Sequence, residues 1–289
     1  MTTLYALDFN DPQSDSSYSH LVSPKRVTEA EYWEKYYQLP GVIYEWHNGY
    51  LEEKAVSDVL TITLYKWFLE LLEHYLRTHM IAQSVLLEMG FRLVLPNSIE
   101  IRRPDLGVVK NDNPIPLLPH DKSYHGTFDL CVEALSDSTT QIMERDTIIK
   151  KQEYAQGGVQ EYYILDSHPE RLNFYRLSKA RGIYLPIKPT KEGIIKSKEL
   201  PGFQFRITDL LSRPSPDDMI NDPVYQNFVL PGYREAKQQL FEVQQQAFEA
   251  KQQLFGVQQA YQAEALARQR AEQRAQRLAD KMRALGIEP

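Results

Sequence analysis

The fold is decided by RRPDLGVV at residues 102–109, DLCVEALSDST at residues 129–139 and RDTIIKKQEYAQGGVQEYYILD at residues 145–166. The first two contain short apolar runs, at residues 106–109 and 130–135, which are typical of strands buried on both faces. The third changes from a helical pattern, ended by Gly157-Gly158, to an apolar strand at residues 161–166. This order predicts an α/β domain with a mixed sheet flanked by helices.

An acidic residue stands beside or inside each of the first two strands. Asp105 follows Pro104 just before one strand, and Glu133 lies inside the apolar run of the other. A buried lone carboxylate is costly unless it is paired or binds a metal. If the strands are neighbours, the two carboxylates converge and repel each other, and Mg²⁺ or Mn²⁺ would relieve that repulsion. Such an ion polarises a phosphate and lowers the pKa of bound water.

The helix expected at residues 138–157 adds a cation to these carboxylates. Lys150 at the rim of this helix could position the attacking water or stabilise charge on phosphorus. Asp146 lies one turn earlier and can pair with Lys150. Ile148 and Ile149 suggest that this part of the helix packs on the sheet.

Each of these residues also has a plainer explanation. Asp105 after a proline suits a turn at the start of a strand. Glu133 could form a salt bridge with an arginine such as Arg103, and Lys150 could be solvated. The functional interpretation therefore depends on the combination.

The sequence before these stretches predicts a helix, a hairpin and a second helix. Thr28 can cap a short helix together with a glutamate three residues later. Residues 42–54 read VIYEWHNGYLEEK, in which Asn48-Gly49 between two apolar runs predicts a β-hairpin. Residues 58–78 predict one amphipathic helix. Its expected apolar face comprises Leu60, Leu64, Trp67, Phe68, Leu71, Leu72 and Tyr75. Further strands are expected at residues 85–87, 91–95, 172–177 and 184–187.

The chain is expected to divide into four parts. These are a disordered N-terminus at residues 1–25, the α/β domain at 26–212, a proline-rich linker at 213–232 and a helix at 233–286. The helix has a heptad seam formed by Ala236, Leu240, Val243, Ala247, Ala250, Leu254, Val257 and Tyr261. This seam predicts a coiled coil that joins the chain into a homodimer or higher oligomer. A helix folded back on the core is the alternative.

Composition limits the class of protein. The net charge of -6 argues against non-specific polyanion binding, but a site for divalent cations must itself be acidic. Cys131 lies in an apolar run and is expected to be a buried thiol. There is no stretch of about 20 apolar residues and no signal peptide, so the cytoplasm is the expected location and no membrane partner is expected.

The motifs resemble the Uma-type family of restriction-endonuclease-like proteins, within the PD-(D/E)XK nuclease superfamily. The match runs over roughly residues 28–211, with a further short similarity at the C-terminal sequence Leu-Gly-Ile-x-Pro. Its elements are Tyr44-Glu45, Asn48-Gly49, Pro104-Asp105, Glu133, Leu135-Ser136, Asp146, Lys150, Tyr154-Ala155, Gly158-Val159 and Glu161-Tyr162-Tyr163.

The resemblance implies a nuclease-type fold in which Asp105 and Glu133 bind the metal. The superfamily lysine normally stands two residues after the glutamate, where this chain has Leu135, so its role would fall to Lys150. Many family members also place a histidine at the start of the long helix, near Ser57, and this chain has none there.

These arguments lead to a Mg²⁺- or Mn²⁺-dependent endonuclease that hydrolyses DNA, with Asp105, Glu133 and Lys150 as its catalytic residues. Glu45 could be an auxiliary metal ligand or could orient Lys150. Candidate contacts to the nucleic-acid backbone are Arg102, Arg103 and Lys110. The alternative is a catalytically inactive member that binds nucleic acid or protein through its coiled coil. A third hypothesis is a structural protein in which the coiled coil is the working part.

Overall fold

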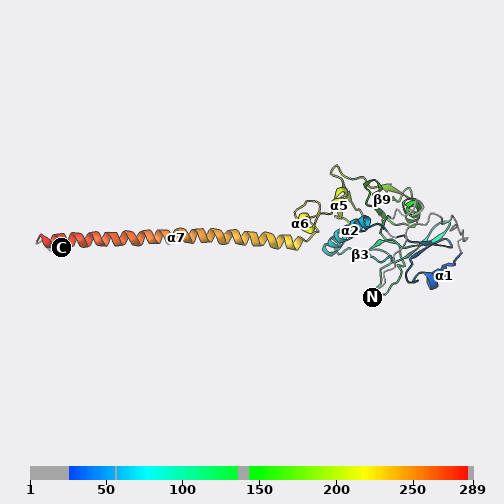
Figure 1. Ribbon diagram of the computed structural model, residues 1–289, viewed down its shortest axis with the longest axis horizontal. Coiled ribbons are helices and arrows are strands. Elements are labelled where there is room, and N and C mark those ends of the chain that lie inside the picture. Colours follow the sequence, from blue (N-terminus) through cyan, green and yellow to red (C-terminus); the bar gives the residue numbers. More distant parts are fainter. Residues whose placement is uncertain (1–25, 56, 136–142, 286–289) are drawn as a thin grey trace, which may run out of the picture. The chain divides into compact units, whose positions relative to one another are not determined.

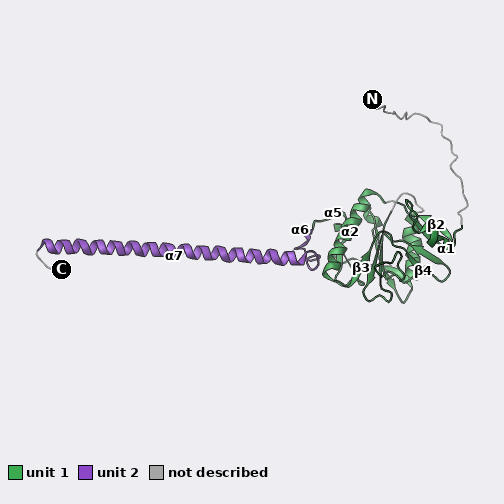
Figure 2. Ribbon diagram, turned by 90° about the horizontal axis from the view of Figure 1, so that it is seen from below, with its two compact units in different colours: residues 1–215 green, residues 216–289 purple. Residues whose placement is uncertain are grey.

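The computed structural model describes residues 26–55, 57–135 and 143–285 (Figure 1). The chain divides into two compact units, residues 1–215 and 216–289 (Figure 2). The expectations for the N-terminus, for Ser136, for the start of the helix at residues 138–142 and for the last four residues lie outside the described part.

The centre of the first unit is a six-stranded sheet in the order β10-β9-β8-β7-β6-β3. Its strands are β3 (Ala82–Val85), β6 (Leu106–Lys110), β7 (Leu130–Ala134), β8 (Glu161–Leu165), β9 (Asn173–Ser178) and β10 (Ile183–Pro186). Only β7 and β8 are parallel to each other, while the other neighbours are antiparallel, so the predicted mixed sheet is confirmed. All five residues of β8 are buried, as expected of a strand covered on both faces.

A second, antiparallel sheet has the order β2-β1-β5-β4. It consists of β1 (Tyr44–His47), β2 (Tyr50–Glu53), β4 (Phe91–Val94) and β5 (Ile99–Arg102). The predicted hairpin is confirmed, because Asn48 (φ 42°) and Gly49 (φ 98°) form a two-residue turn between β1 and β2. Strand β5 was not predicted, nor was the small sheet of β11 (Ile194–Lys196) and β12 (Gln204–Arg206).

Two helices begin directly after a capping side chain, and the first of these caps, Thr28, was predicted. The side chain of Thr28 caps α1 (Glu29–Glu31), which continues as η1 (Tyr32–Tyr36), and Asp58 caps α2 (Val59–Thr78). The helix before β8 consists of η2 (Arg145–Ile149) and α4 (Lys150–Gln156). The shorter helices are η3 (Pro169–Arg171), α5 (Ile207–Ser212) and α6 (Pro216–Met219).

The helices α2 and α4 pack on opposite faces of the six-stranded sheet. Neighbouring residues of a strand point to opposite faces. On β8, the ring of Tyr162 contacts Tyr154 of α4, while the ring of Tyr163 contacts Phe68 of α2. Most of the predicted apolar face of α2 is buried, but Leu60 in its first turn is 62% exposed.

One further prediction in this unit, for Leu87, is wrong, and another, for Cys131, is confirmed. Leu87 was expected in a strand but is 93% exposed, with a left-handed φ of 57°, because β3 ends at Val85. Cys131 is fully buried, as expected, and burial raises the pKa of its thiol well above the ordinary value.

The second unit contains one continuous helix of 54 residues, α7 (Pro231–Ala284). None of its residues is buried, and apolar side chains of the predicted seam are exposed, Leu240 by 58% and Leu254 by 60%. The segment expected as a linker contains α6 and buried apolar side chains, among them Tyr225 and Phe228. None of the helices in the described residues combines the length and apolar character needed to cross a membrane.

Two glycines give a matched test of this packing. A Cβ on Gly107 of β6 would lie 2.5 Å from the ring of Phe128, which is fully buried against Phe91. We expect Gly107→Ala to destabilise the first unit by about 1–3 kcal/mol, measured by urea unfolding. Beyond its own helix backbone and chain neighbours, a Cβ on Gly256 of α7 would have no described atom within 4 Å, so Gly256→Ala should increase helicity and leave core unfolding unchanged. Equal effects of the two substitutions would contradict this packing.

Candidate active site

The pairing of β6 with β7 brings Asp105 and Glu133 together. Leu106 lies opposite Val132, so the residue before β6 meets the residue that follows Val132. The backbone N–H of Ala134 donates a hydrogen bond to Asp105 Oδ2 (2.6 Å). Lys54 Nζ then bridges the two carboxylates, at 2.7 Å from Asp105 Oδ1 and 3.8 Å from Glu133 Oε2. The expected convergence is therefore present, with an ammonium group between the two acids.

Lys150 holds three carboxylates from the opposite side. Its Nζ lies 3.1 Å from Glu133 Oε1, 3.2 Å from Glu45 Oε1 and 3.0 Å from Asp146 Oδ1. The hydroxyl of Tyr154 donates a second hydrogen bond to Glu133 Oε1 (2.8 Å). Thus Glu45, Asp146 and Glu133 all meet at one ammonium group.

The helix that carries Lys150 turns its polar side to the protein interior. Its buried side chains include Arg145, Asp146, Lys150, Glu153 and Tyr154. Part of this helix packs on the sheet, as expected, through Tyr154, but the choice of Ile148 and Ile149 as the packing residues is wrong, because they are 52% and 38% exposed. The prediction of a rim position for Lys150 is also wrong, since this residue is fully buried. The helix covers a cluster of acids, so the side chains that face it are those that pair with acids.

Arg102 organises a second part of the same buried network. Its guanidinium lies 3.2 Å from Glu45 and 2.6 Å from Glu153, and it also contacts Glu52. Arg102 is fully buried, so the prediction that it contacts a nucleic-acid backbone is wrong. A surface role would require this cation to leave its carboxylates.

The other two predicted backbone contacts are also occupied within the protein. Arg103 donates to the carbonyl oxygen of Tyr37 and lies over the Tyr37 ring, at 4.6 Å from its centroid. Lys110 Nζ lies 3.4 Å from both Asp112 and Glu199, with 23% of its side chain exposed. Of the three predicted contacts, Arg103 and Lys110 are partly exposed and only Arg102 is fully buried.

Acids outnumber cations in this network. Among the described residues, its ion pairs join eight carboxylates to four Lys or Arg side chains and one histidine. The acids are Glu45, Glu52, Glu88, Glu100, Asp105, Glu133, Asp146 and Glu153, and the bases are Lys54, Arg102, Arg145, Lys150 and His47. This excess of negative charge favours the binding of additional cations.

The two glutamates on Lys150 differ in their titration. Burial raises the pKa of Glu133 to about 7, against the opposing effect of Lys150 and Lys54. The pKa of Glu45 is lowered, because Lys150 and Arg102 outweigh the effect of its burial. Glu133 is thus the acid that is closest to uptake of a proton near neutral pH.

This difference predicts the pH dependence of stability without metal. Between the ordinary pKa of 4.5 and a folded value of about 7, the unfolded chain has released the Glu133 proton that the folded protein keeps. Stability from this group is therefore full below pH 4.5 and is lost as the pH rises through about 7. We expect the unfolding free energy of the wild type, minus that of Glu133→Gln, to fall over this range in EDTA. A constant difference would contradict the raised pKa.

Lys54 and the organising role of Arg102 were not predicted from the sequence. One signal for them was available in the hairpin, where Glu45 lies directly opposite Glu52. Two like charges in that position repel each other unless a cation lies between them. Lys54, two residues after Glu52, belongs by strand alternation to the same face.

The fold is of a nuclease type, and Asp105 and Glu133 at its neighbouring strands β6 and β7 lie beside the ammonium groups of Lys54 and Lys150. The chain belongs to the family described as "Uma2: Putative restriction endonuclease", which matches residues 33–209. A similar solved structure is that of a "putative nuclease belonging to DUF820" from Anabaena variabilis ATCC 29413. That structure is 16% identical, has a TM-score of 0.50 and covers 64% of this chain and 98% of its own, which supports the fold. No curated protein matches the chain.

Proposed function

We propose that this protein is a Mg²⁺- or Mn²⁺-dependent endonuclease that hydrolyses DNA phosphodiester bonds. The observation that carries the proposal is the meeting of Asp105 and Glu133 at one cationic group, Lys54 Nζ. An ammonium between two acids marks a position where a cation is stabilised, and carboxylate oxygens are the ligands that Mg²⁺ prefers. The donor set therefore fits a hard divalent ion.

The side chains around this position suggest separate roles. Asp105, with 20% of its side chain exposed, and the buried Glu133 would hold the ion. A bound Mg²⁺ supplies a Lewis acid and a more acidic water molecule. Lys150 would fix the orientation of Glu133 and Glu45 and favour the ionised form of Glu133. Lys54, released from Asp105, would be free to contact a phosphate oxygen of the substrate.

The α7 helix supports the proposal that two chains act together. Its exposed seam repeats with a coiled-coil spacing, and a coiled coil would bury it between two copies. A homodimer would offer two sites to the two strands of a duplex. Light scattering should give the mass of a dimer or a higher oligomer, and Leu254→Glu in the seam should shift it toward the monomer. A monomeric wild type would contradict self-association.

The test of the function is cleavage of supercoiled plasmid with Mg²⁺, Mn²⁺ or EDTA, beside Asp105→Ala. We expect nicking with either metal, none in EDTA, and loss of nicking in the variant. Millimolar metal should also raise the melting temperature of the wild type but not of the variant. Failure to cut, together with no stabilisation by metal, would favour an inactive module that binds nucleic acid or protein.

A further inference from the structure

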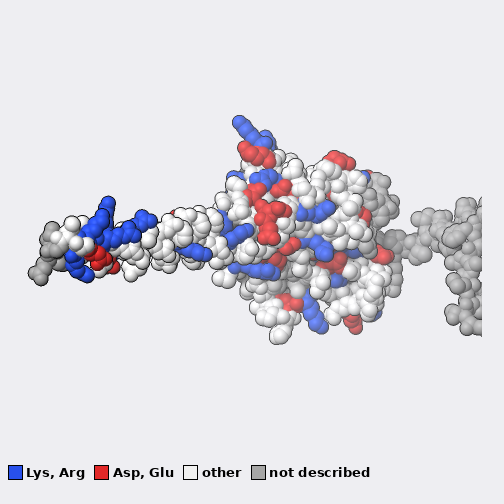
Figure 3. All heavy atoms as spheres, turned by 60° about the vertical axis from the view of Figure 1, so that its left-hand side comes forward, with Lys and Arg blue, Asp and Glu red and all other residues white. Residues whose placement is uncertain are grey.

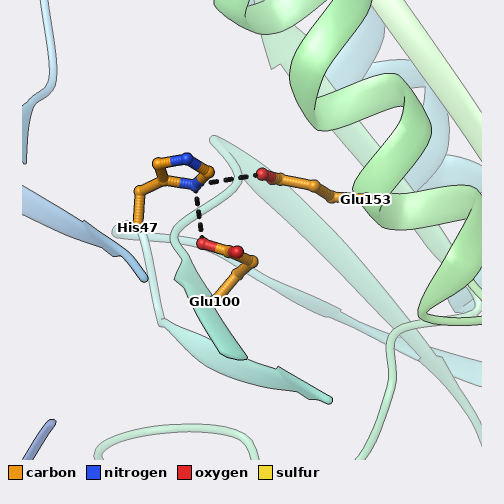
Figure 4. Close-up of side chains that lie close together, drawn as sticks. All are labelled: His47, Glu100 and Glu153. Atoms are coloured by element: carbon orange, nitrogen blue, oxygen red, sulfur yellow. Dashed lines mark hydrogen bonds and ion pairs between the residues drawn. The ribbon is translucent and has the colours of Figure 1, made fainter. Parts of the chain in front are cut away.

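A second group of potential metal ligands lies on the other side of Arg102 from Lys150. Figure 4 shows Glu100 and Glu153 converging on one ring nitrogen of His47. His47 Nδ1 is 2.7 Å from Glu100 Oε2 and 3.3 Å from Glu153 Oε1. One ligand atom from each residue lies within 4.8 Å of the others. None of these three side chains belongs to the proposed pair of Asp105 and Glu133.

Regular secondary structure places all three ligands. His47 of β1 lies directly opposite Glu100 of β5 in the antiparallel register. Glu153 lies in α4, three residues after Lys150, on the buried side of that helix. The cluster therefore depends on strand pairing and helix packing, and a metal site on such elements is held in a fixed geometry.

Glu100 gives independent evidence that this cluster can bind a cation. Its side chain is only 1% exposed, and its Oε1 is buried without a hydrogen-bond partner among the described residues. Its other oxygen, Oε2, contacts His47 alone among the described residues. Buried polar atoms are nearly always satisfied, so an unsatisfied carboxylate oxygen in a group of ligands points to a cation.

We infer that His47, Glu100 and Glu153 form a second metal site, which binds Zn²⁺ and is separate from the Asp105–Glu133 position. An imidazole nitrogen with two carboxylate oxygens is a set that Zn²⁺ accepts, whereas Mg²⁺ prefers oxygen alone. His47 is 37% exposed, which gives the ion a path of entry and leaves room for water as a fourth ligand.

Arg102 is compatible with an ion at this position. It donates to both oxygens of Glu153, from Nε (2.6 Å) and Nη2 (2.9 Å). A carboxylate has about four lone-pair directions, so Glu153 can serve the guanidinium and the metal together. Arg102 Nη2 also lies 3.3 Å from His47 Nδ1, and this contact must yield when the nitrogen binds the ion.

The site would tie β1 and β5 to α4, the helix that carries Lys150 and Tyr154. Zn²⁺ would thereby stabilise the position of Lys150 without contacting the carboxylates that surround Lys150. This role is independent of the proposed nuclease activity, because the ion would bind whether or not the protein cuts DNA.

The test is Zn²⁺ binding by full-length, metal-stripped protein, titrated against a chromophoric chelator and followed by melting temperature. The variants are Glu100→Gln, which keeps the size of the side chain, and the double variant Asp105→Asn/Glu133→Gln. We expect one Zn²⁺ per chain in the wild type and in the double variant. Binding should weaken at least tenfold in Glu100→Gln, and excess Mg²⁺ should not displace the ion.

Each of the following results would contradict the proposed Zn²⁺ site. Zn²⁺ binding that survives Glu100→Gln but is lost in the double variant would place the ion at Asp105 and Glu133. No Zn²⁺ binding by the wild type would leave His47 as a protonated partner of its two carboxylates. Co²⁺ substitution of the wild type needs no variant, and its absorption spectrum should report nitrogen and oxygen ligands in a low-symmetry site. A spectrum unchanged from aqueous Co²⁺ would also contradict the proposal.

Discussion

Glu133→Gln is expected to abolish metal-dependent nicking of plasmid, with a loss of about 10²-fold or more. The amide keeps the shape of the side chain and can still contact Lys150 and Tyr154, but it removes the negative charge that would hold the ion. Folding should persist, because Lys150 retains Glu45 and Asp146 as partners. The measurement is the initial rate of nicking in Mg²⁺ and in Mn²⁺.

The matched control is Glu170→Gln, the same substitution at an exposed glutamate of η3. Its nicking rate should equal that of the wild type. A Glu133→Gln protein that cuts at the wild-type rate, with an unchanged metal requirement, would remove Glu133 from the proposed site.

Lys150→Met is expected to give the largest loss of stability among these substitutions. Methionine fills much of the same space but leaves Glu133, Glu45 and Asp146 without their shared ammonium group. Removal of one partner from a buried ion pair costs about 3–5 kcal/mol. For a domain of this size, that corresponds to a fall in melting temperature of roughly 10 °C. Urea unfolding followed by circular dichroism would measure the change.

Two control variants distinguish the loss of the buried ammonium group from a general effect of replacing lysine by methionine. Lys191→Met, at an exposed lysine, should leave unfolding unchanged. A Lys150→Met/Glu133→Gln double variant should recover part of the lost stability, because one of the unpaired charges is removed. Wild-type stability in Lys150→Met would mean that the three carboxylates do not depend on this cation.

Several features of this protein were predictable from the sequence because they depend on neighbouring residues. Asn48-Gly49 sets a hairpin turn, Asp58 caps the start of α2, and a heptad spacing extends α7 as one helix. Turn geometry, capping and periodicity act over a few residues, so their signals survive in a single sequence. Glu133 was predictable for a related reason, since an acid inside an apolar strand requires a partner.

Lys150 was predicted among those partners, but the others were decided by the tertiary structure alone. Lys54 and Asp105 are 51 residues apart, and β5, which carries Glu100 and Arg102, was not expected to be a strand. The polar side of the α4 helix faces inward because strand pairing has already gathered acids beneath it. A lysine or an arginine is ordinarily solvated, and only long-range strand register supplies the carboxylates that make its burial favourable. The sequence by itself indicated the local elements, the two central acids and Lys150, whereas the tertiary structure alone added Lys54 and the buried position of Arg102.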